Sequence, residues 1–205
     1  MVKRGYHHGN LRQAFVDAAL TLIEAKGPTG FTLSEAAKAA GVTPAAVYRH
    51  FAGREDLIAE AARQGFEVFA DLMEHAYSKG QPSALGALEA TGRAYLAFAR
   101  KFPGHYVAMF ESGISVNRDP DLAMVAGRGL GVLEKAASEL MAELPPEKRP
   151  PARMVSAHIW ALSHGVVELF ARGARRPSVA KRAYCGLKTG IGIYLRGLGL
   201  IKFDG

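Results

Sequence analysis

The chain has 205 residues, of which 49% are hydrophobic and 22% charged, which is typical of a globular protein with one or two compact domains. The formal net charge of +7 suits a polyanionic partner such as nucleic acid. The single cysteine, Cys185, excludes an intramolecular disulfide and a cysteine-based metal cluster. No uncharged apolar run approaches the ~20 residues that span a bilayer. We therefore expect a soluble, cytoplasmic protein with no membrane partner.

The first helix is predicted at about residues 10–26, and Gly27-Pro28 ends it. Ahead of it, Lys3 and Arg4 form a short basic arm suited to a phosphate or minor-groove contact. Apolar side chains recur along the helix at helical spacing and form one stripe: Leu11, Phe15, Ala18, Ala19, Leu22 and Ile23.

A short helix is predicted next, at about residues 33–40. Thr32 and Glu35 have the spacing of a capping box, in which the hydroxyl accepts from the Glu35 amide and the carboxylate reaches back to the Thr32 amide. Gly41 supplies the left-handed residue that stops the helix.

A second short helix follows, at about residues 44–50. Thr43 is its expected N-cap, and Pro44 takes the first helical position, where a missing N–H costs nothing. Val47 and Phe51 are expected to face the core. Two helices of roughly two turns, joined by a short glycine-containing turn, make a helix-turn-helix.

A helix-turn-helix reads DNA because its second helix fits the major groove, which is about 12 Å wide. The backbone can approach the bases at the N-terminal end of that helix, and hydroxyl, imidazole and guanidinium groups around it can donate to phosphates. The residues expected at the DNA are Lys3, Arg4, Thr32, Thr43, Pro44, Ala45, Tyr48, Arg49, His50 and Arg54.

The rest of the chain is predicted to be helical, with no strong strand candidate and no internal repeat. Helices are expected at about residues 54–78, 84–101, 104–112, 120–144, 152–173 and 178–198. Five glycines in or just after the last of these would weaken it in isolation, and close helix–helix packing would offset the loss. The fold class is all-α. We expect a three-helix DNA-binding domain at residues 1–53, and a helical ligand-binding and dimerisation domain at residues 54–205 whose first helix links the two.

Aromatic and apolar residues in the later helices are candidates for a ligand pocket, although such clusters are more often ordinary core. The candidate ligand-binding residues are Phe98, Tyr106, Met109, Phe110, Trp160 and His164. His7 and His8 are adjacent, so they do not share a helix face, and no further ligands are spaced to join them. We expect no metal site and no cofactor.

The stretch from Phe31 to Leu57 resembles the DNA-binding domain of the TetR family of bacterial regulators, and the resemblance covers about residues 8–58. The features that carry it, in this order and spacing, are Thr32, Ala36-Ala37, Gly41-Val42, Tyr48-x-His50-Phe51 and Glu55-Asp56-Leu57.

This resemblance implies a homodimer that places two recognition helices in successive major grooves of a near-palindromic operator. It also implies a C-terminal domain that binds a small-molecule effector and dimerises through the last two helices. The expected function is a transcriptional repressor that its ligand releases from double-stranded DNA. Many relatives carry a larger or more polar residue at the position of Ala45 or Ala46. We therefore expect few hydrogen bonds to base edges here, and a larger share of DNA recognition from Arg49, the basic arm and apolar contacts to thymine methyls.

Two further segments resemble one subgroup of this family. Trp160 to Gly165 matches a Trp-x-x-x-His-Gly pattern of its C-terminal domain, and Tyr6 to Arg12 resembles its N-terminal opening. The subgroup does not specify a ligand.

Two alternatives remain open. An enzyme would hold its site around His105, His158 or His164, with Glu168 four residues after the last, but no nucleophile elbow, P-loop or HExxH pattern is present and we expect no catalysis. An architectural protein would coat DNA, and its binding affinity would depend steeply on salt and differ little between sequences.

Overall fold

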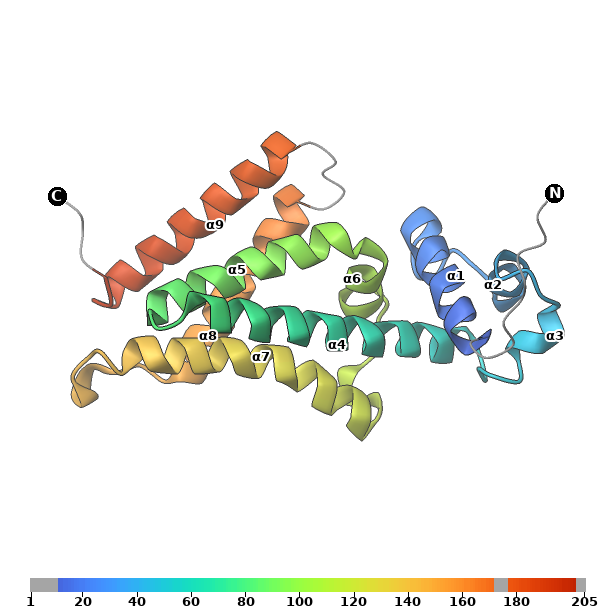
Figure 1. Cartoon of the computed structure of the whole chain (residues 1–205), viewed down its shortest axis with the longest axis horizontal. Helices are drawn as coiled ribbons and strands as arrows, with labels where there is room; N and C mark the ends of the chain where they lie inside the picture. Colours follow the sequence, from blue (N-terminus) through green and yellow to red (C-terminus); the bar gives the residue numbers. More distant parts are fainter. Residues whose placement is uncertain (1–10, 172–176, 202–205) are drawn as a thin grey trace. The chain divides into compact units, whose positions relative to one another are not determined.

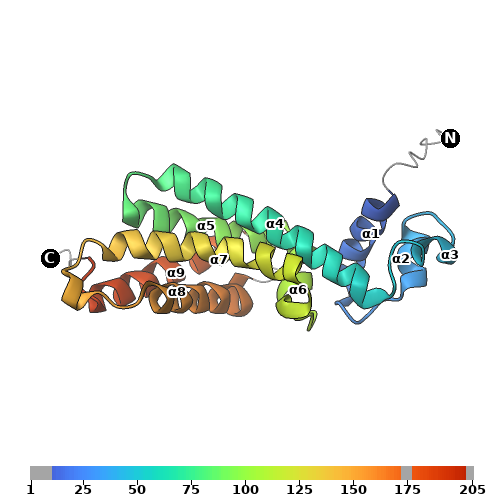
Figure 2. The same cartoon turned by 90° about the horizontal axis from the view of Figure 1, so that it is seen from below.

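The computed structural model describes residues 11–171 and 177–201, shown in Figure 1 and, turned by 90°, in Figure 2. The described residues form helices joined by turns, and no strand occurs among them. The all-α prediction is therefore confirmed. None of the described helices has the length and apolar character needed to cross a membrane. The chain forms two compact units. One comprises the described residues up to Gly65 together with 104–122, and the other comprises 66–103 and the described residues from 123 onward.

The first unit contains α1 (Leu11–Lys26), α2 (Leu33–Ala39), α3 (Pro44–Val47), the start of α4 (Arg54–Gly80) and almost all of α6 (Pro103–Phe110). Its core is built from the predicted apolar stripe of α1 and from side chains of the following helices. Rings from two distant segments meet edge to face in this core, where the Phe15 and Phe51 centroids are 6.3 Å apart. Other fully buried members are Val16, Ile23, Ala36, Ala37, Val47 and Leu57.

α3 is shorter than predicted, because it ends at Val47 instead of about His50. The amides of His50 and Phe51 both donate to the Val47 carbonyl, and residues 48–50 form turns. The His50 carbonyl accepts a hydrogen bond from the Arg12 guanidinium at 3.0 Å. A side chain of α1 therefore satisfies a carbonyl in the turn that follows α3.

The second unit contains the rest of α4, α5 (Ala84–Lys101), α7 (Pro120–Met141) apart from its first residues, α8 (Ala152–Val166) and α9 (Pro177–Gly197). Other helix ends also differ from prediction: α4 continues to Gly80, α6 stops at Phe110, α7 stops at Met141, and α8 passes at Val167 into a π-helical turn that reaches Ala171. The hydroxyl of Ser112 donates to the Ala108 carbonyl at 2.6 Å, so a side chain takes up this carbonyl at the end of α6.

α4, α5 and α7 run alongside one another in the second unit (Figure 1 and Figure 2). The ring of Phe69 on α4 packs edge to face on Tyr95 and Phe98 of α5, with centroids 5.4 and 5.2 Å apart. From the other side, α7 approaches the same ring through Gly129, where a Cβ would lie 2.7 Å from two of its atoms. Polar contacts join the outer faces of α4 and α7, where Arg128 reaches Asp71 and Glu74 at 2.9 and 3.0 Å.

Candidate nucleic-acid interface

The capping box predicted at the start of α2 is present. The Thr32 hydroxyl accepts from the Glu35 amide at 3.2 Å, and the Thr32 amide donates to the Glu35 carboxylate at 2.8 Å. The same carboxylate pairs with the Lys26 ammonium at 2.6 Å. The hydrogen bond from Lys26, followed by those from the Thr32 amide and hydroxyl, lowers the pKa of Glu35. The cap thus ties α2 to the end of α1 and leaves Thr32 at the surface.

The turn between α2 and α3 also follows its predicted chemistry. Gly41 has a φ of +76°, a left-handed conformation that favours glycine. Thr43 occupies the N-cap position, but its hydroxyl makes no side-chain capping hydrogen bond, and Pro44 takes the first helical position. Thr43, Pro44 and Ala45 are exposed, whereas Val47 on the opposite side is fully buried. α3 therefore presents a surface of small side chains.

Tyr48 and Arg49 extend this exposed surface beyond the end of α3. The Tyr48 side chain is 60% exposed, and Arg49 is exposed beside it. His50 is half-buried, because its ring lies 5.6 Å from the Phe15 ring. The structure thus gives His50 a packing role in addition to its predicted place at the DNA.

Arg54, at the start of α4, is held by backbone oxygens. Its Nη1 atom donates to the Thr29 and Phe31 carbonyls at 3.0 and 3.4 Å, which fixes the loop that leads into α2. A shallow hollow of about 650 Å³ is lined by Thr32, Tyr48 and Arg54 together with Arg118. Three predicted DNA-contacting residues therefore meet in one place. Lys3 and Arg4 lie outside the described residues.

Arg118 is an addition that sequence reasoning missed. It comes from the 3-10 turn Val116–Arg118, between α6 and α7, and its guanidinium lies 3.9 Å from the Glu55 carboxylate at the start of α4. No motif marks this arginine, because its place beside the helix-turn-helix depends on how the chain returns after α6. It adds a cation to the hollow.

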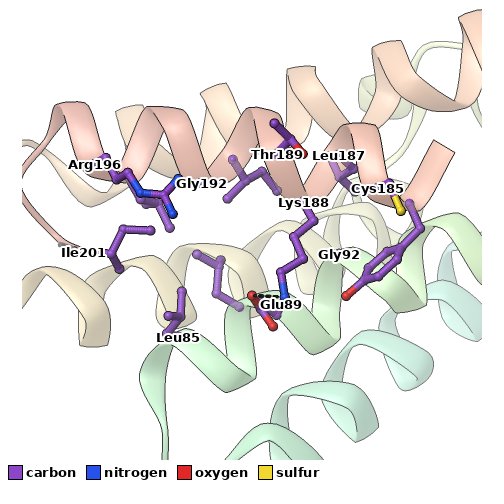
Figure 3. A pocket seen from close by; sticks show the side chains of 14 residues that line it. Leu85, Glu89, Gly92, Cys185, Leu187, Lys188, Thr189, Gly192, Arg196 and Ile201 are labelled. Atoms are coloured by element: carbon purple, nitrogen blue, oxygen red, sulfur yellow. Dashed lines mark ion pairs between the residues drawn. The ribbon is translucent and has the colours of Figure 1, made fainter. Parts of the chain in front are cut away.

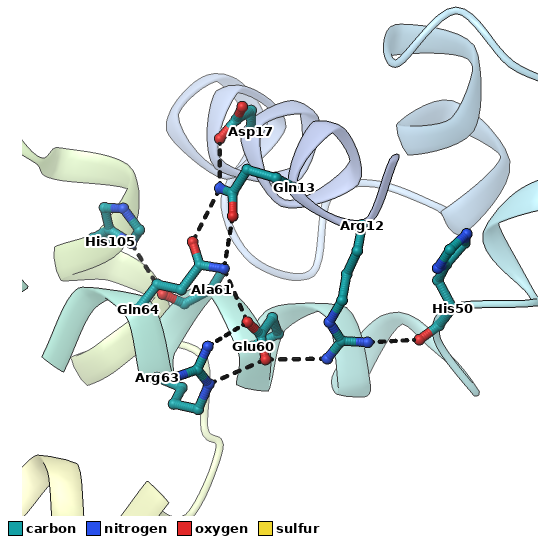
Figure 4. Close-up of polar contacts among 9 residues, drawn as sticks. All are labelled: Arg12, Gln13, Asp17, His50, Glu60, Ala61, Arg63, Gln64 and His105. Carbon is teal, nitrogen blue, oxygen red and sulfur yellow. Dashed lines mark hydrogen bonds and ion pairs between the residues drawn. The ribbon is translucent and has the colours of Figure 1, made fainter. Parts of the chain in front are cut away.

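A second set of contacts that the sequence analysis missed holds α1 against α4 (Figure 4). The Glu60 carboxylate receives Arg12 at 3.1 Å, Arg63 at 2.6 Å and Gln64 at 2.9 Å. Burial alone would raise the pKa of Glu60, but the hydrogen bonds from Arg63, Gln64 and Arg12 outweigh it and lower the pKa to about 2. Glu60 is therefore ionised at neutral pH and links two helices of the first unit.

α6 is fastened to both α1 and α4. The Gly104 amide donates to the Glu24 carboxylate at 3.0 Å. His105 Nδ1 lies 2.9 Å from the Ala61 carbonyl, as Figure 4 shows. A carbonyl can only accept, so Nδ1 carries the proton. Burial lowers the pKa of His105, so the ring is neutral at neutral pH.

The six predicted ligand-binding residues fall into separate groups. Phe98 is buried in the second unit, while Trp160 and His164 are half-buried there and meet Tyr95, whose hydroxyl is 2.8 Å from His164 Nδ1. Met109 is buried on α6 in the first unit. There, the rings of Tyr106 and Phe110 are 5.0 Å apart. The hollow beside Arg54 is lined by other residues, and the ligand-binding role of these six remains a prediction.

A cavity of about 600 Å³ lies elsewhere, between α5 and α9 (Figure 3). Leucines from both helices line it, and Glu89, Lys188 and Arg196 stand among them. Sequence reasoning did not find it, because a cavity is a space left between two packed helices and has no motif.

The histidines considered for catalysis are not grouped into one site. His105 is bound to the Ala61 carbonyl, His158 Nδ1 is 2.9 Å from the Tyr194 hydroxyl, and His164 contacts Tyr95. Within the described ranges, no three His, Cys, Asp or Glu side chains are grouped so that they could hold a metal ion.

Comparisons with known proteins agree with this geometry. A family model described as bacterial regulatory proteins of the tetR family matches residues 15–61, and one described as a tetracyclin repressor-like C-terminal domain matches residues 88–184. Neither description distinguishes the Trp-His-Gly subgroup. The HTH-type transcriptional regulator YobS of Bacillus subtilis is 29% identical over 49% of this chain and 51% of its own length, so the chain spans about half of that relative.

Solved structures share the fold over most of the chain. A protein with unknown function from Rhodococcus sp. RHA1 has a TM-score of 0.76 at 22% identity, covering 95% of this chain and 98% of its own. The transcriptional regulator FadR from Bacillus subtilis, solved in complex with stearoyl-CoA, has a TM-score of 0.71 at 16% identity, covering 87% of this chain and 97% of its own. At these identities the likeness shows a common fold.

Proposed function

The chain belongs to the TetR family of bacterial regulatory proteins, and from this we propose that it is a sequence-specific transcriptional repressor that a small-molecule ligand releases from DNA. One observation carries the proposal: α2 and α3 are joined by a left-handed Gly41, and α3 exposes small side chains next to a 60% exposed Tyr48. An exposed helix with small residues can approach base edges closely, which is what a recognition helix must do.

The DNA-contacting residues divide by chemistry. Thr43, Pro44 and Ala45 would meet base edges, while the Thr32 hydroxyl, Tyr48 and Arg54 would meet phosphates around the hollow they share. The phosphate contacts orient α3, and base contacts give specificity. Lys3, Arg4, Arg49 and His50 complete the proposed interface, and residues 1–53 form the proposed DNA-binding domain.

We further propose that the protein acts as a homodimer through α8 and α9, in the cytoplasm where its DNA partner is. Large apolar side chains of this region are exposed in the single chain, among them Leu162 at 38%, Leu169 at 75%, Phe170 at 60% and Ile193 at 64%. Apolar surface of this extent favours association. Two recognition helices about 34 Å apart would then read the two halves of a near-palindromic operator.

A small-molecule effector is the third part of the proposal. Residues 54–205 form the proposed ligand-binding and dimerisation domain, with Phe98, Tyr106, Met109, Phe110, Trp160 and His164 as ligand candidates. The FadR structure, with its bound stearoyl-CoA, supports a ligand for a protein of this fold. α4 belongs to both compact units, so a ligand-dependent shift of this helix would reach the DNA-binding residues. Linkage then requires that DNA weaken ligand binding by the same factor by which the ligand weakens DNA binding.

The test is selection of binding sites from a random pool of double-stranded DNA with the purified protein. We expect enrichment of an inverted repeat that is bound by two chains, and Tyr48→Ala should weaken binding to it by about tenfold while leaving dimerisation intact. Met124→Ala on α7, which is 64% exposed, is the control and should bind normally.

Salt-sensitive binding without enrichment would contradict sequence-specific recognition and favour an architectural DNA-coating protein. Unchanged operator binding by Tyr48→Ala would show that the recognition surface lies elsewhere.

A further inference from the structure

The cavity between α5 and α9 has the size and lining of a ligand site. Its volume of about 600 Å³ lies in the usual range of small-molecule pockets. The floor is apolar, because leucines of both helices line it, among them Leu85 and Leu187 (Figure 3). Thus the site has a largely apolar lining within the second unit.

Missing side chains help to create this space. Gly92, on the buried face of α5, lines the cavity, and a Cβ placed there would meet only Leu187, at an ordinary contact distance of 3.6 Å. On α9, Gly192 is covered by the Arg196 guanidinium, which lies 3.3 Å from the position of its Cβ. Larger residues at these two positions would occupy volume that the cavity now holds.

The charges of the lining favour an anion. Lys188 and Arg196 outnumber the single carboxylate, Glu89. Glu89 already has two cations near it, Lys188 at 3.4 Å and Arg93 at 3.8 Å, so it has little left for a cationic ligand. An anionic group would instead meet a net positive rim and could share Lys188 with Glu89.

From this combination we infer that the α5–α9 cavity binds a single-chain amphiphile, whose alkyl chain lies on the leucine floor and whose anionic head lies between Lys188 and Arg196. A medium-chain carboxylate is the simplest member of this class. The binding site stands on the cavity alone, whereas its use as an effector site rests on the proposed regulatory function.

Dodecanoate, below its micelle concentration, is the probe for the full chain, and dodecanol is its neutral counterpart. Calorimetry or equilibrium dialysis should show one dodecanoate bound per chain. Shortening the chain to decanoate should weaken binding by about fourfold for each methylene lost, as apolar burial requires. Dodecanoate should bind more tightly than dodecanol because of its charge.

Two kinds of variant locate the probe. Lys188→Gln and Arg196→Gln should each weaken dodecanoate binding by about tenfold, the loss expected for one hydrogen bond to a charged group, and leave dodecanol binding unchanged. Lys181→Gln is the matched control, because Lys181 is an exposed cation on the same helix that does not line the cavity.

Gly92→Met should fill the cavity and remove binding of both probes. Gly127→Met is its control, because Gly127 is an exposed helical glycine with open space at its Cβ. Leu85→Trp, at a half-buried lining position, blocks the cavity in a second way if Gly92→Met does not fold.

The outcomes separate this inference from the proposed function. No binding of either probe, with operator selection intact, overturns the site and leaves the regulator standing. Probe binding that the cavity variants remove, in a protein that selects no operator, supports the site and contradicts the proposed function. If the blocking variants change the sedimentation of the dimer but leave probe binding unchanged, a second copy of the chain covers the cavity. That result would rule out the cavity as the binding site of the amphiphile. Equal binding of both probes in all charge variants would refute the anionic head.

Discussion

Arg12 and Glu60 form an ion pair of 3.1 Å that joins α1 to α4, although the two residues are 48 positions apart. The same guanidinium donates to the His50 carbonyl and lies 4.6 Å above the Phe51 ring. One side chain therefore connects the first helix, the segment after α3 and the start of α4. The stability of the proposed DNA-binding surface depends on this arrangement.

Acid should weaken the first unit through Glu60. Its pKa is about 2 in the folded protein, below the ordinary 4.5. A group with a lowered folded pKa contributes stability above its unfolded pKa and loses it as pH falls through the folded value. We expect that loss between about pH 4.5 and pH 2, and Glu60→Gln should cost about 1–2 kcal/mol of unfolding free energy at pH 7 and remove this part of the acid dependence.

Urea unfolding at a series of pH values measures this effect. Glu55→Gln is the control, since that carboxylate is 76% exposed and 3.9 Å from its cation, and it should change stability by less than about 0.5 kcal/mol. A Glu60→Gln protein with the acid dependence of the original would contradict the role given to this carboxylate.

Arg54 should affect both DNA binding and stability. Arg54→Ala removes a phosphate contact in the proposed interface and also two hydrogen bonds to the loop before α2. We expect the slope of log affinity against log salt to fall by about 1, and the free energy of unfolding to fall by about 1 kcal/mol.

Arg54→Lys separates the two effects, because it keeps the charge but cannot reproduce the guanidinium's contacts with both carbonyls. Its salt slope should match that of the original protein and its stability should not. If Arg54→Ala leaves the salt slope unchanged, Arg54 supports the loop and does not contact phosphate.

Charge on the exposed apolar surface of α8 and α9 should dissociate the proposed dimer. Phe170→Glu and Ile193→Glu would place a carboxylate in that interface, and we expect each to raise the dimer dissociation constant by at least about tenfold. Analytical ultracentrifugation measures the change. Met124→Glu on α7 has the same exposure as Ile193, 64%, and should sediment like the original protein. A similar change in all three variants would place the interface elsewhere.

Two glycines of α7 should respond in opposite directions to the same substitution. A Cβ at Gly129 would lie 2.7 Å from the Phe69 ring, so Gly129→Ala should destabilise the second unit by about 1–3 kcal/mol. Nothing lies within 4 Å at Gly127, so Gly127→Ala should be neutral or stabilise by up to about 1 kcal/mol through helix propensity. Thermal unfolding of both variants checks the close approach of α7 to α4, and equal stability would mean that the helices are further apart.

Helix ends were predicted best where a few neighbouring residues decide them. α5 has the predicted bounds, and α1 and α9 agree within a residue at each end that the structure describes. α3 was predicted to reach about His50 but ends at Val47, and the turn after it is held by Arg12, which lies 38 positions from His50 in the sequence. The exposed surface formed by Thr43, Pro44 and Ala45 followed from local signals. Arg118, by contrast, reached the hollow beside Arg54 only through the path of the chain after α6.

By itself, the sequence determined the all-helical fold, the capped α2, the left-handed turn at Gly41 and the exposed start of α3. These depend on helical periodicity and on hydrogen bonds between residues three or four positions apart, so spacing alone specifies them. The tertiary structure alone decided the contacts of Glu60 with Arg12, the attachment of α6 through Glu24 and Ala61, and the cavity between α5 and α9. These depend on which side chains, or missing side chains, meet when helices distant in the chain pack together, and no local pattern encodes that meeting.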